Sequence, residues 1–409
     1  MVTNWAGNVS FNAARFHQPS SVSEVRRLVA EAGRVKALGT GHSFSRIADT
    51  PGDLISLERL PTIIAIDPGQ SSVTISADVT YGELAPRLHD AGLALANLGS
   101  LPHISVAGAC ATGTHGSGNR LGNLATAVSA IEMVTADGDL VTLRRGQGDF
   151  PGAVVALGAL GIVVGLTLGT EPTYYLRQYV YDDLPQGFLD EQLAVIFAGG
   201  YSVSLFTDWR GQLINQVWIK QRLPAGDPEP ELHGARLADG PRHPVPGMSP
   251  AHCTPQLGVA GPWHKRLPHF QFDSTPSAGR ELQSEYLLPR SSAVAAISAI
   301  GAVRDVVAPV LQVSEMRTIA ADDLWLSPCY QRDSVALHFT WIDDLSAVAP
   351  ALAVVEEQLA PFHPRPHWGK LFDRAGRYDR LPDFLHLMDR YDPAGKFGND
   401  FLSNSLGEG

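Results

Sequence analysis

Two segments rich in glycine, serine and threonine, each carrying a histidine, constrain this chain more than any other feature. The first spans residues 39–45 and reads Gly-Thr-Gly-His-Ser-Phe-Ser, and the second spans residues 99–118. Such segments let the backbone approach an anion and direct several N–H groups at it, and a pyrophosphate is the natural occupant. Neither is a Rossmann fingerprint, because Phe44 replaces the third glycine, and neither is a Walker A loop, because no lysine follows Gly113. The alternative is that both segments are merely tight turns.

Residues 1–173 are predicted to form a mixed domain. Capping boxes beginning at Ser21 and Thr80 each open a helix. Strands at 63–67 and 72–79, and at 127–135 and 140–143, are separated by turn residues that indicate two hairpins, and a short strand at 34–38 leads into the first glycine-rich segment. The apolar run at 153–166 predicts a helix turning into a buried strand, and it is shorter than the roughly 20 residues of a membrane helix. Hairpins mixed with crossovers favour an α+β fold over a doubly wound one.

A second, sheet-centred domain is predicted for residues 174–373. Alternating strands are expected at 202–209, 215–221, 311–319 and 334–342, and the Pro/Gly/His-rich stretch 224–268 is expected to be a long loop. The remaining segment, 374–409, predicts a helix from Phe384 onward.

Charge and cysteine content narrow the class of protein. The net charge is −11 and no long basic run occurs, so we expect no nucleic-acid partner. Cys110, Cys253 and Cys329 are odd in number and far apart, which suits a reducing compartment. Neither a signal peptide nor a membrane span is predicted, so we expect a cytoplasmic protein.

Two of the predicted strands each carry a polar face. Glu315 and Arg317 share one face of the strand 311–319, and His338 and Thr340 share one face of the strand 334–342. Such a face is either exposed to solvent or lines a polar cavity. The spacing of His363 and His367 resembles a metal-binding pair, but the prolines at 364 and 366 exclude the helix that such a pair needs, so no metal site is predicted.

Together these motifs resemble the vanillyl-alcohol-oxidase superfamily of FAD enzymes. The segments Ala-Leu-Gly-Thr-Gly-His-Ser-Phe-Ser and Ser-Leu-Pro-His-Ile-Ser-Val-Ala-Gly, with Ala-Thr-Gly-Thr-His-Gly-Ser-Gly after it, carry the resemblance. The motifs at 314–318, 337–341, 367–370 and 392–399 match its sugar-alcohol (alditol or xylitol) oxidase branch, which is related to the aldonolactone oxidases. The resemblance covers nearly the whole chain. It implies a two-domain FAD-binding fold with a sheet-centred substrate (cap) domain, in which residues 374–409 return to the FAD-binding domain.

The resemblance also implies how FAD is held. His42 would be joined covalently to the flavin, which requires an unprotonated imidazole nitrogen at the ring edge. Some relatives attach the flavin through a cysteine as well, but Cys110 lies in a different context and is expected to be a small buried thiol. The implied cofactor-binding residues are Ala37, Leu38, Gly39, Thr40, Gly41, His42, Ser43, Gly99, Ser100, Ser105, Gly108, Thr112, Gly113, Thr114, His115, Gly161 and Ile162.

The same resemblance implies the chemistry. Ser100, Glu315, Arg317, Thr340 and Lys370 would bind a polyol, Arg317 and Lys370 would stabilise a developing alkoxide at C1, and His338 would accept the hydroxyl proton. Hydride transfer to flavin N5 and reoxidation by O2 would yield an aldose and hydrogen peroxide. The alternatives are an aldonolactone oxidase or dehydrogenase (gulono- or arabinono-lactone type), a nicotinamide-dependent polyol dehydrogenase, and a sugar-binding protein. A monomer is expected.

Overall fold

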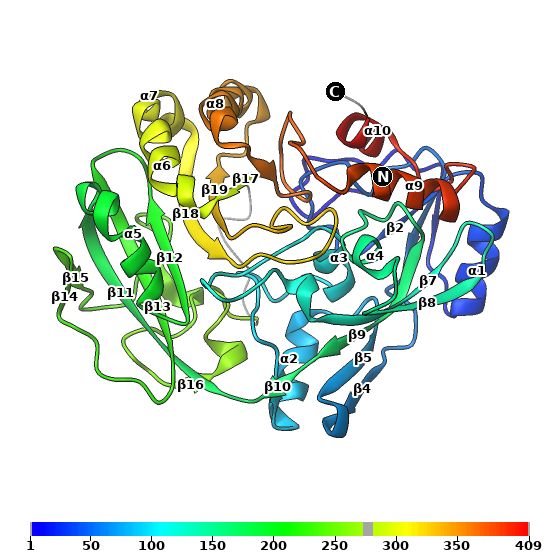
Figure 1. Ribbon diagram of the computed structural model, residues 1–409, viewed down its shortest axis with the longest axis horizontal. Helices are drawn as coiled ribbons and strands as arrows, with labels where there is room; N and C mark the ends of the chain where they lie inside the picture. The colour runs from blue at the N-terminus through cyan, green and yellow to red at the C-terminus, as the bar shows by residue number, and fades with distance from the viewer. Residues whose placement is uncertain (1, 273–280, 408–409) are drawn as a thin grey trace.

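The computed structural model describes residues 2–272 and 281–407, and its chain forms two lobes (Figure 1). In the first lobe, Ser21 caps helix α1 (Val22–Glu31) by accepting a hydrogen bond from the Glu24 N–H, as the capping box predicts. This helix connects strands of a parallel sheet ordered β1 (Arg15–His17), β3 (Asp53–Ser56), β2 (Val35–Leu38). The first glycine-rich segment therefore begins at the carboxyl end of β2.

The second sheet of this lobe is antiparallel and contains both predicted hairpins. Its order is β4 (Ile64–Asp67), β5 (Ser72–Ser76), β9 (Ile162–Gly169), β7 (Val128–Val134), β8 (Leu140–Arg144). The helices are α2 (Tyr81–Asp90), α3 (Val106–Ala111) and α4 (Phe150–Val154), and β6 (Leu93–Ala94) pairs with β10 (Glu171–Pro172). The run 153–166 was predicted to be helix turning into strand. Instead, α4 ends at Val154, because Val155 (φ −93°, ψ 70°) leaves the helical conformation, and the positive φ of Leu157 and Gly158 prevents the helix from resuming; only the strand prediction is confirmed.

The second lobe is built on one large sheet, drawn in green to orange in Figure 1. Its main strands are β11 (Tyr175–Pro185), β12 (Ser202–Thr207), β13 (Leu213–Arg222), β17 (Leu282–Pro289), β18 (Leu311–Ile319) and β19 (Ser334–Trp341). The order is β14-β15-β11-β13-β12-β18-β19-β17-β20, with β16 paired to β11. The stretch 224–268 is more than a loop, because it contributes β14 (Glu231–Leu232), β15 (Ala235–Leu237) and β16 (Gly261–Pro262). The last strand of the order is β20 (Arg365–Pro366).

Helices bury one face of this sheet. Val335, Leu337, Phe339 and Trp341 of β19 belong to one core cluster with apolar side chains of α5 (Leu189–Ala198), α6 (Ala293–Ala302) and α8 (Leu345–Leu359). The short α7 (Arg304–Val307) follows α6. The opposite face of β18 and β19 is turned toward the first lobe.

The C-terminal helices α9 (Leu381–Tyr391) and α10 (Asp400–Leu406) pack on the first lobe, where Figure 1 shows them in red near the N-terminal segment. The Lys396 ammonium group donates to the carbonyls of Val29, Ala30 and Ala136, at 2.9, 3.1 and 2.8 Å. Asn399 donates to the carbonyls of Arg46, Ile47 and Asp49, just beyond the first glycine-rich segment. The tail thus fixes the segment that carries His42.

Within residues 2–272 and 281–407, no single helix combines the length and apolar composition needed to cross a bilayer. One bent pair, Arg290–Ala302 with Arg304–Val310, meets those two criteria, and the α6 part of it packs against the large sheet.

Candidate active site

A cavity of about 400 Å³ extends between the two lobes. In the first lobe it is lined by both glycine-rich segments and by residues 153–161, and in the second lobe by the polar face of β17, β18 and β19. Of the seventeen predicted cofactor-binding residues, fifteen line this cavity, and the exceptions are Gly113 and Ile162. Gly113 instead packs against Pro328, and Ile162 is buried in an apolar cluster with Val25 and Val134. These two residues thus lie outside the cavity lining, and their predicted contact with the cofactor stays a prediction.

The first-lobe end of the cavity fits a flat, anionic dinucleotide such as FAD. A Cβ on either Gly39 or Gly108 would lie 2.8 Å from the Ser105 hydroxyl oxygen, so the two glycine-rich segments meet closely around this serine only because glycines are present. The Ser105 N–H donates to the Thr40 hydroxyl, which joins the segments directly. The result is a backbone-lined cradle of the kind that a pyrophosphate requires.

His42 lies farther along the cavity with a free ring nitrogen. Its Nδ1 is buried and has no hydrogen-bond partner among the described residues. Trp5 stacks on the imidazole with ring centroids 5.5 Å apart and an interplanar angle of 16°. Burial, with smaller effects from the charge of Lys370 and from His103, lowers the pKa of His42 to about 4. The imidazole is therefore neutral at physiological pH, which a bond to a flavin methyl group would require.

The second-lobe end of the cavity is set by strand register. Glu315 on β18 lies opposite His338 on β19, which lies opposite Glu285 on β17. The row below pairs Val313, Thr340 and Gln283 in the same way. All of these side chains line the cavity, so the alternative of a solvent-exposed polar face is wrong.

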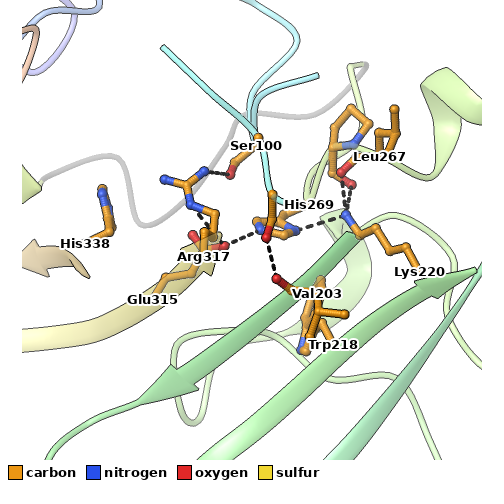
Figure 2. A network of polar contacts seen from close by, with 12 residues as sticks. Ser100, Val203, Trp218, Lys220, Leu267, His269, Glu315, Arg317 and His338 are labelled. Atoms are coloured by element: carbon orange, nitrogen blue, oxygen red, sulfur yellow. Dashed lines mark hydrogen bonds and ion pairs between the residues drawn. The ribbon is translucent and has the colours of Figure 1, made fainter. Parts of the chain in front are cut away.

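Arg317 is held in this row by two carboxylates, of which Figure 2 shows Glu315. It lies opposite Ala336, whose small side chain lets the guanidinium reach across β19, and its Nη2 is 2.6 Å from Glu285 Oε1. Its Nε is 3.6 Å from Glu315 Oε1, and its Nη1 is 3.5 Å from the Ser100 hydroxyl. Although burial opposes it, the Arg317 charge lowers the pKa of Glu285 well below its usual range. Both carboxylates are thus ionised, and the Arg317 charge is largely compensated.

The charge of Lys370 is less compensated by carboxylates than the charge of Arg317. Its ammonium group donates to the Gln283 amide oxygen and lies 5.0 Å from the centre of the Phe44 ring, but no ion pair with a carboxylate is recorded for it in the described parts of the chain. Burial lowers the pKa of Lys370 to about 8, against the smaller opposing effect of Glu285. Backbone hydrogen bonds from His367 to Glu285 and from Leu371 to Gln283 place this lysine beside β17.

Several residues of the cluster were not predicted from the sequence. Glu285 has side-chain oxygens 3.3 Å from His115 Nε2 and 3.4 Å from His338 Nδ1, and it is only 1% exposed. The signal was present, because Glu281, Gln283 and Glu285 occupy alternate positions at the start of this segment. His367 and His269 also line the cavity. His115, predicted to bind the cofactor, also borders the second-lobe cluster.

Cys110 is a buried thiol, as predicted. Burial raises its pKa to about 12, its sulfur lies 3.9 Å from the Tyr81 hydroxyl, and Cys110 is not part of the cavity lining. Such a thiol carries almost no thiolate at neutral pH and is a poor nucleophile.

Comparisons with known proteins agree with this geometry. Residues 13–144 match a family described as an FAD binding domain, and residues 275–405 match one described as D-arabinono-1,4-lactone oxidase. An alditol oxidase from a Streptomyces species is 50% identical over 99% of both chains. An L-gulono-1,4-lactone dehydrogenase from Mycobacterium tuberculosis is 28% identical over 99% of both chains, and an L-gulonolactone oxidase from Mus musculus is 27% identical over 98% of this chain and 96% of that one.

The fold itself is shared with a solvent-stable cholesterol oxidase. The TM-score is 0.80 over 99% of this chain and 97% of the other, at 16% sequence identity. This similarity confirms the predicted α+β, two-lobe fold, and the match of residues 13–144 to an FAD binding domain, with the 50% identity to an alditol oxidase, supports its assignment as an FAD-binding fold.

Proposed function

Because this chain belongs to the alditol oxidase family of FAD-dependent oxidoreductases, we propose that it oxidises the primary C1 hydroxyl of sugar alcohols such as xylitol and sorbitol to the aldose. The observation that carries the proposal is the polar row Glu315–His338–Glu285, with Arg317 and Lys370 beside it, at one end of a cavity whose other end is lined by both glycine-rich segments. The aldonolactone enzymes are more distant relatives. Bound FAD would supply the hydride acceptor and, with O2, the route to hydrogen peroxide.

Some of these side chains bind the polyol, and others activate its C1 hydroxyl. Glu315, Thr340 and Ser100 offer acceptors and donors that match a row of hydroxyl groups. His338 accepts the C1 hydroxyl proton; its Nε2 lies 3.2 Å from the Thr340 hydroxyl, and its Nδ1, 3.4 Å from Glu285, has no hydrogen-bond partner among the described residues. Lys370 stabilises the developing alkoxide, since its charge is the least compensated in the cluster. Arg317 orients the substrate more than it supplies net charge.

The test of this function is anaerobic mixing of the holoenzyme with xylitol, sorbitol, glycerol and a 1,4-lactone. We expect the polyols to bleach the flavin absorbance faster than the lactone. Faster bleaching by the lactone would assign the chain to the aldonolactone activity instead.

We further propose that His42 carries the covalent link to FAD. Acid precipitation of the wild-type protein should leave the yellow colour in the pellet, and His42→Ala should release it to the supernatant. His252→Ala is the matched control, because His252 is exposed and lies outside the cavity lining. A colourless wild-type pellet contradicts the proposal.

Gly99 is proposed to keep open the path of O2 to the flavin. Alanine fits here, because an added Cβ would lie 3.8 Å from Thr114 Cγ2 and 3.9 Å from the His115 carbonyl oxygen, and Gly99 is not among the positive-φ residues. The alternative role for Gly99, a backbone conformation that alanine cannot adopt, is therefore not supported. We predict that Gly99→Ala slows flavin reoxidation by O2 and leaves reduction by polyol near normal in stopped-flow measurements. Slowed reduction with normal reoxidation would contradict this prediction.

We also propose a domain organisation, an oligomeric state and a cellular location. The FAD-binding domain would comprise residues 1–173 and 374–409, and the substrate domain residues 174–373, which is supported by the packing of α9 and α10 on the first lobe. We also propose a cytoplasmic monomer that acts on a small polyol and O2 without a nucleic-acid partner, which size-exclusion chromatography and cell fractionation would test.

A further inference from the structure

Two further buried residues are linked to Glu315: His269, which also lines the cavity, contacts Glu315, and Lys220 contacts His269. Neither is among the residues described above as binding the polyol. Figure 2 shows the chain of contacts: Glu315 Oε1 lies 2.8 Å from His269 Nε2, and His269 Nδ1 lies 3.2 Å from Lys220 Nζ. Lys220 is 1% exposed and His269 is 5% exposed. Charged groups this far from water are retained at a cost, so their arrangement calls for an explanation.

Burial lowers the pKa of Lys220 to about 7, against the smaller opposing effect of the Glu315 charge, so Lys220 is an ammonium group below that pH. Its nitrogen has three acceptors, namely the carbonyls of Leu267 and Pro268 and the Nδ1 atom of His269. An ammonium group has three N–H donors and no lone pair, so it satisfies all three and forces His269 Nδ1 to accept. The single proton of the neutral imidazole must then be on Nε2, where it is donated to Glu315.

His269 is also fixed mechanically. Phe206 and Trp218 contact its ring edge-on, with centroids 5.5 and 5.2 Å away. Its backbone N–H donates to the Ser100 carbonyl, and the Ser100 hydroxyl meets Arg317, which in turn contacts Glu315. These contacts close a ring through His269, Ser100, Arg317 and Glu315. Within the described residues, Glu315 Oε2 has no recorded hydrogen bond and remains available to the cavity.

We propose that Lys220 and His269 are positioning residues that set substrate affinity: Lys220 holds His269 in the Nε2–H tautomer, and His269 fixes Glu315 so that its second oxygen accepts from a substrate hydroxyl. This inference rests on the proposed function, because it takes the substrate to be a polyol. The groups that face His269 are Lys220 from β13 and Glu315 and Arg317 from β18, with the neutral thiol of Cys253 near Lys220 and His338 near Glu315.

The protonation of His269 follows from these neighbours. Burial lowers the pKa of His269 to about 4, the Lys220 charge lowers it further, and the Glu315 charge opposes both. Removing the Lys220 charge should therefore move the His269 pKa upward. In Lys220→Met, His269 should lose its fixed tautomer and take up a proton at a higher pH than in the wild type.

The tautomer is tested directly by NMR of holoenzyme labelled with ¹⁵N-histidine, in which the His269 signals are assigned by their loss in His269→Gln. Between the pKa of His269, about 4, and that of Lys220, about 7, we expect an unprotonated Nδ1 and a protonated Nε2 in the wild type, and a changed pattern in Lys220→Met. A wild-type Nδ1–H would overturn the proposal, as would a spectrum that Lys220→Met leaves unchanged. The wild-type spectrum decides the point even if the variant fails to fold.

The consequence for binding is tested with xylitol. Losing a fixed hydrogen bond from one substrate-binding carboxylate should raise KM about tenfold, with a much smaller change in the limiting rate of flavin reduction. The pH dependence of KM in Lys220→Met should also show protonation of His269 on the acid side. A purely structural role of Lys220 would not produce this. Lys265→Met is the matched control, because Lys265 is exposed and lies outside the cavity lining.

Two outcomes separate this proposal from the proposed function. If no polyol reduces the wild-type flavin, the proposed function fails, while the NMR result still decides the role of Lys220. If xylitol reduces the wild type, and Lys220→Met matches Lys265→Met in KM and in pH profile, the positioning role alone is refuted.

Discussion

Lys370→Met should lower the rate of flavin reduction by polyol about 10²- to 10³-fold, because loss of one preorganised donor to a developing oxyanion typically costs that much. Methionine keeps the length of the side chain and removes the charge. The lysine is chosen over Arg317 because Glu285 and Glu315 already compensate the arginine. Anaerobic stopped-flow absorbance measures the rate, with flavin content and unfolding followed alongside. Unchanged reduction would remove Lys370 from the mechanism.

The same residue predicts a pH dependence. A lysine is charged below its pKa, and burial lowers that of Lys370 to about 8. The reduction rate should therefore fall as the pH rises through about 8 in the wild type. Lys370→Arg should retain some activity and lose this fall, since arginine stays protonated throughout that range. A wild-type rate that stays level to pH 9 would contradict the assignment.

Glu285→Gln should destabilise the folded protein by about 3–5 kcal/mol, because removing one partner of a buried ion pair leaves the other charge uncompensated. Glutamine preserves the shape and leaves Arg317 buried without its closest carboxylate, 2.6 Å away. Denaturant unfolding of the holoenzyme, followed by fluorescence, measures the change. Adding Arg317→Met to the same chain should recover part of the loss, since the buried guanidinium charge that lost Glu285 is then absent; the recovery is partial because Glu315 loses Arg317 as well.

The control for this prediction lies on the same polypeptide segment. Glu281 is also buried, but its recorded partner is the Gln283 amide, so Glu281→Gln should cost much less. Equal costs for the two substitutions would show that Glu285 does not compensate Arg317.

Patterns among neighbouring residues predicted the helices, hairpins and strands that such patterns determine. Capping boxes, turn residues and alternation located α1, α2, two hairpins and the strands that carry Glu315 and His338. Whether their polar face met solvent or a cavity could not be read from period-2 alternation, because that depends on the first lobe packing across it.

The residues that escaped prediction are those whose role depends on long-range pairing. Glu285 becomes part of the site because β17 pairs with β19 in one particular register, and His269 because its backbone bonds to Ser100. Gly113 and Ile162 were predicted to bind the cofactor but lie outside the cavity lining. They belong to motifs whose neighbours line the cavity, but the local backbone turns these two positions into the core.

The placement of the lysines has a practical consequence. Lys36 and Lys220 are buried, Lys370 is in the cavity lining, and Lys396 is held by three carbonyls. Of the five lysines, only Lys265 is exposed. Apart from the amino terminus, an amine-reactive surface or dye would thus attach through this one side chain. The molecule could be immobilised in nearly a single orientation, with its cavity unmodified.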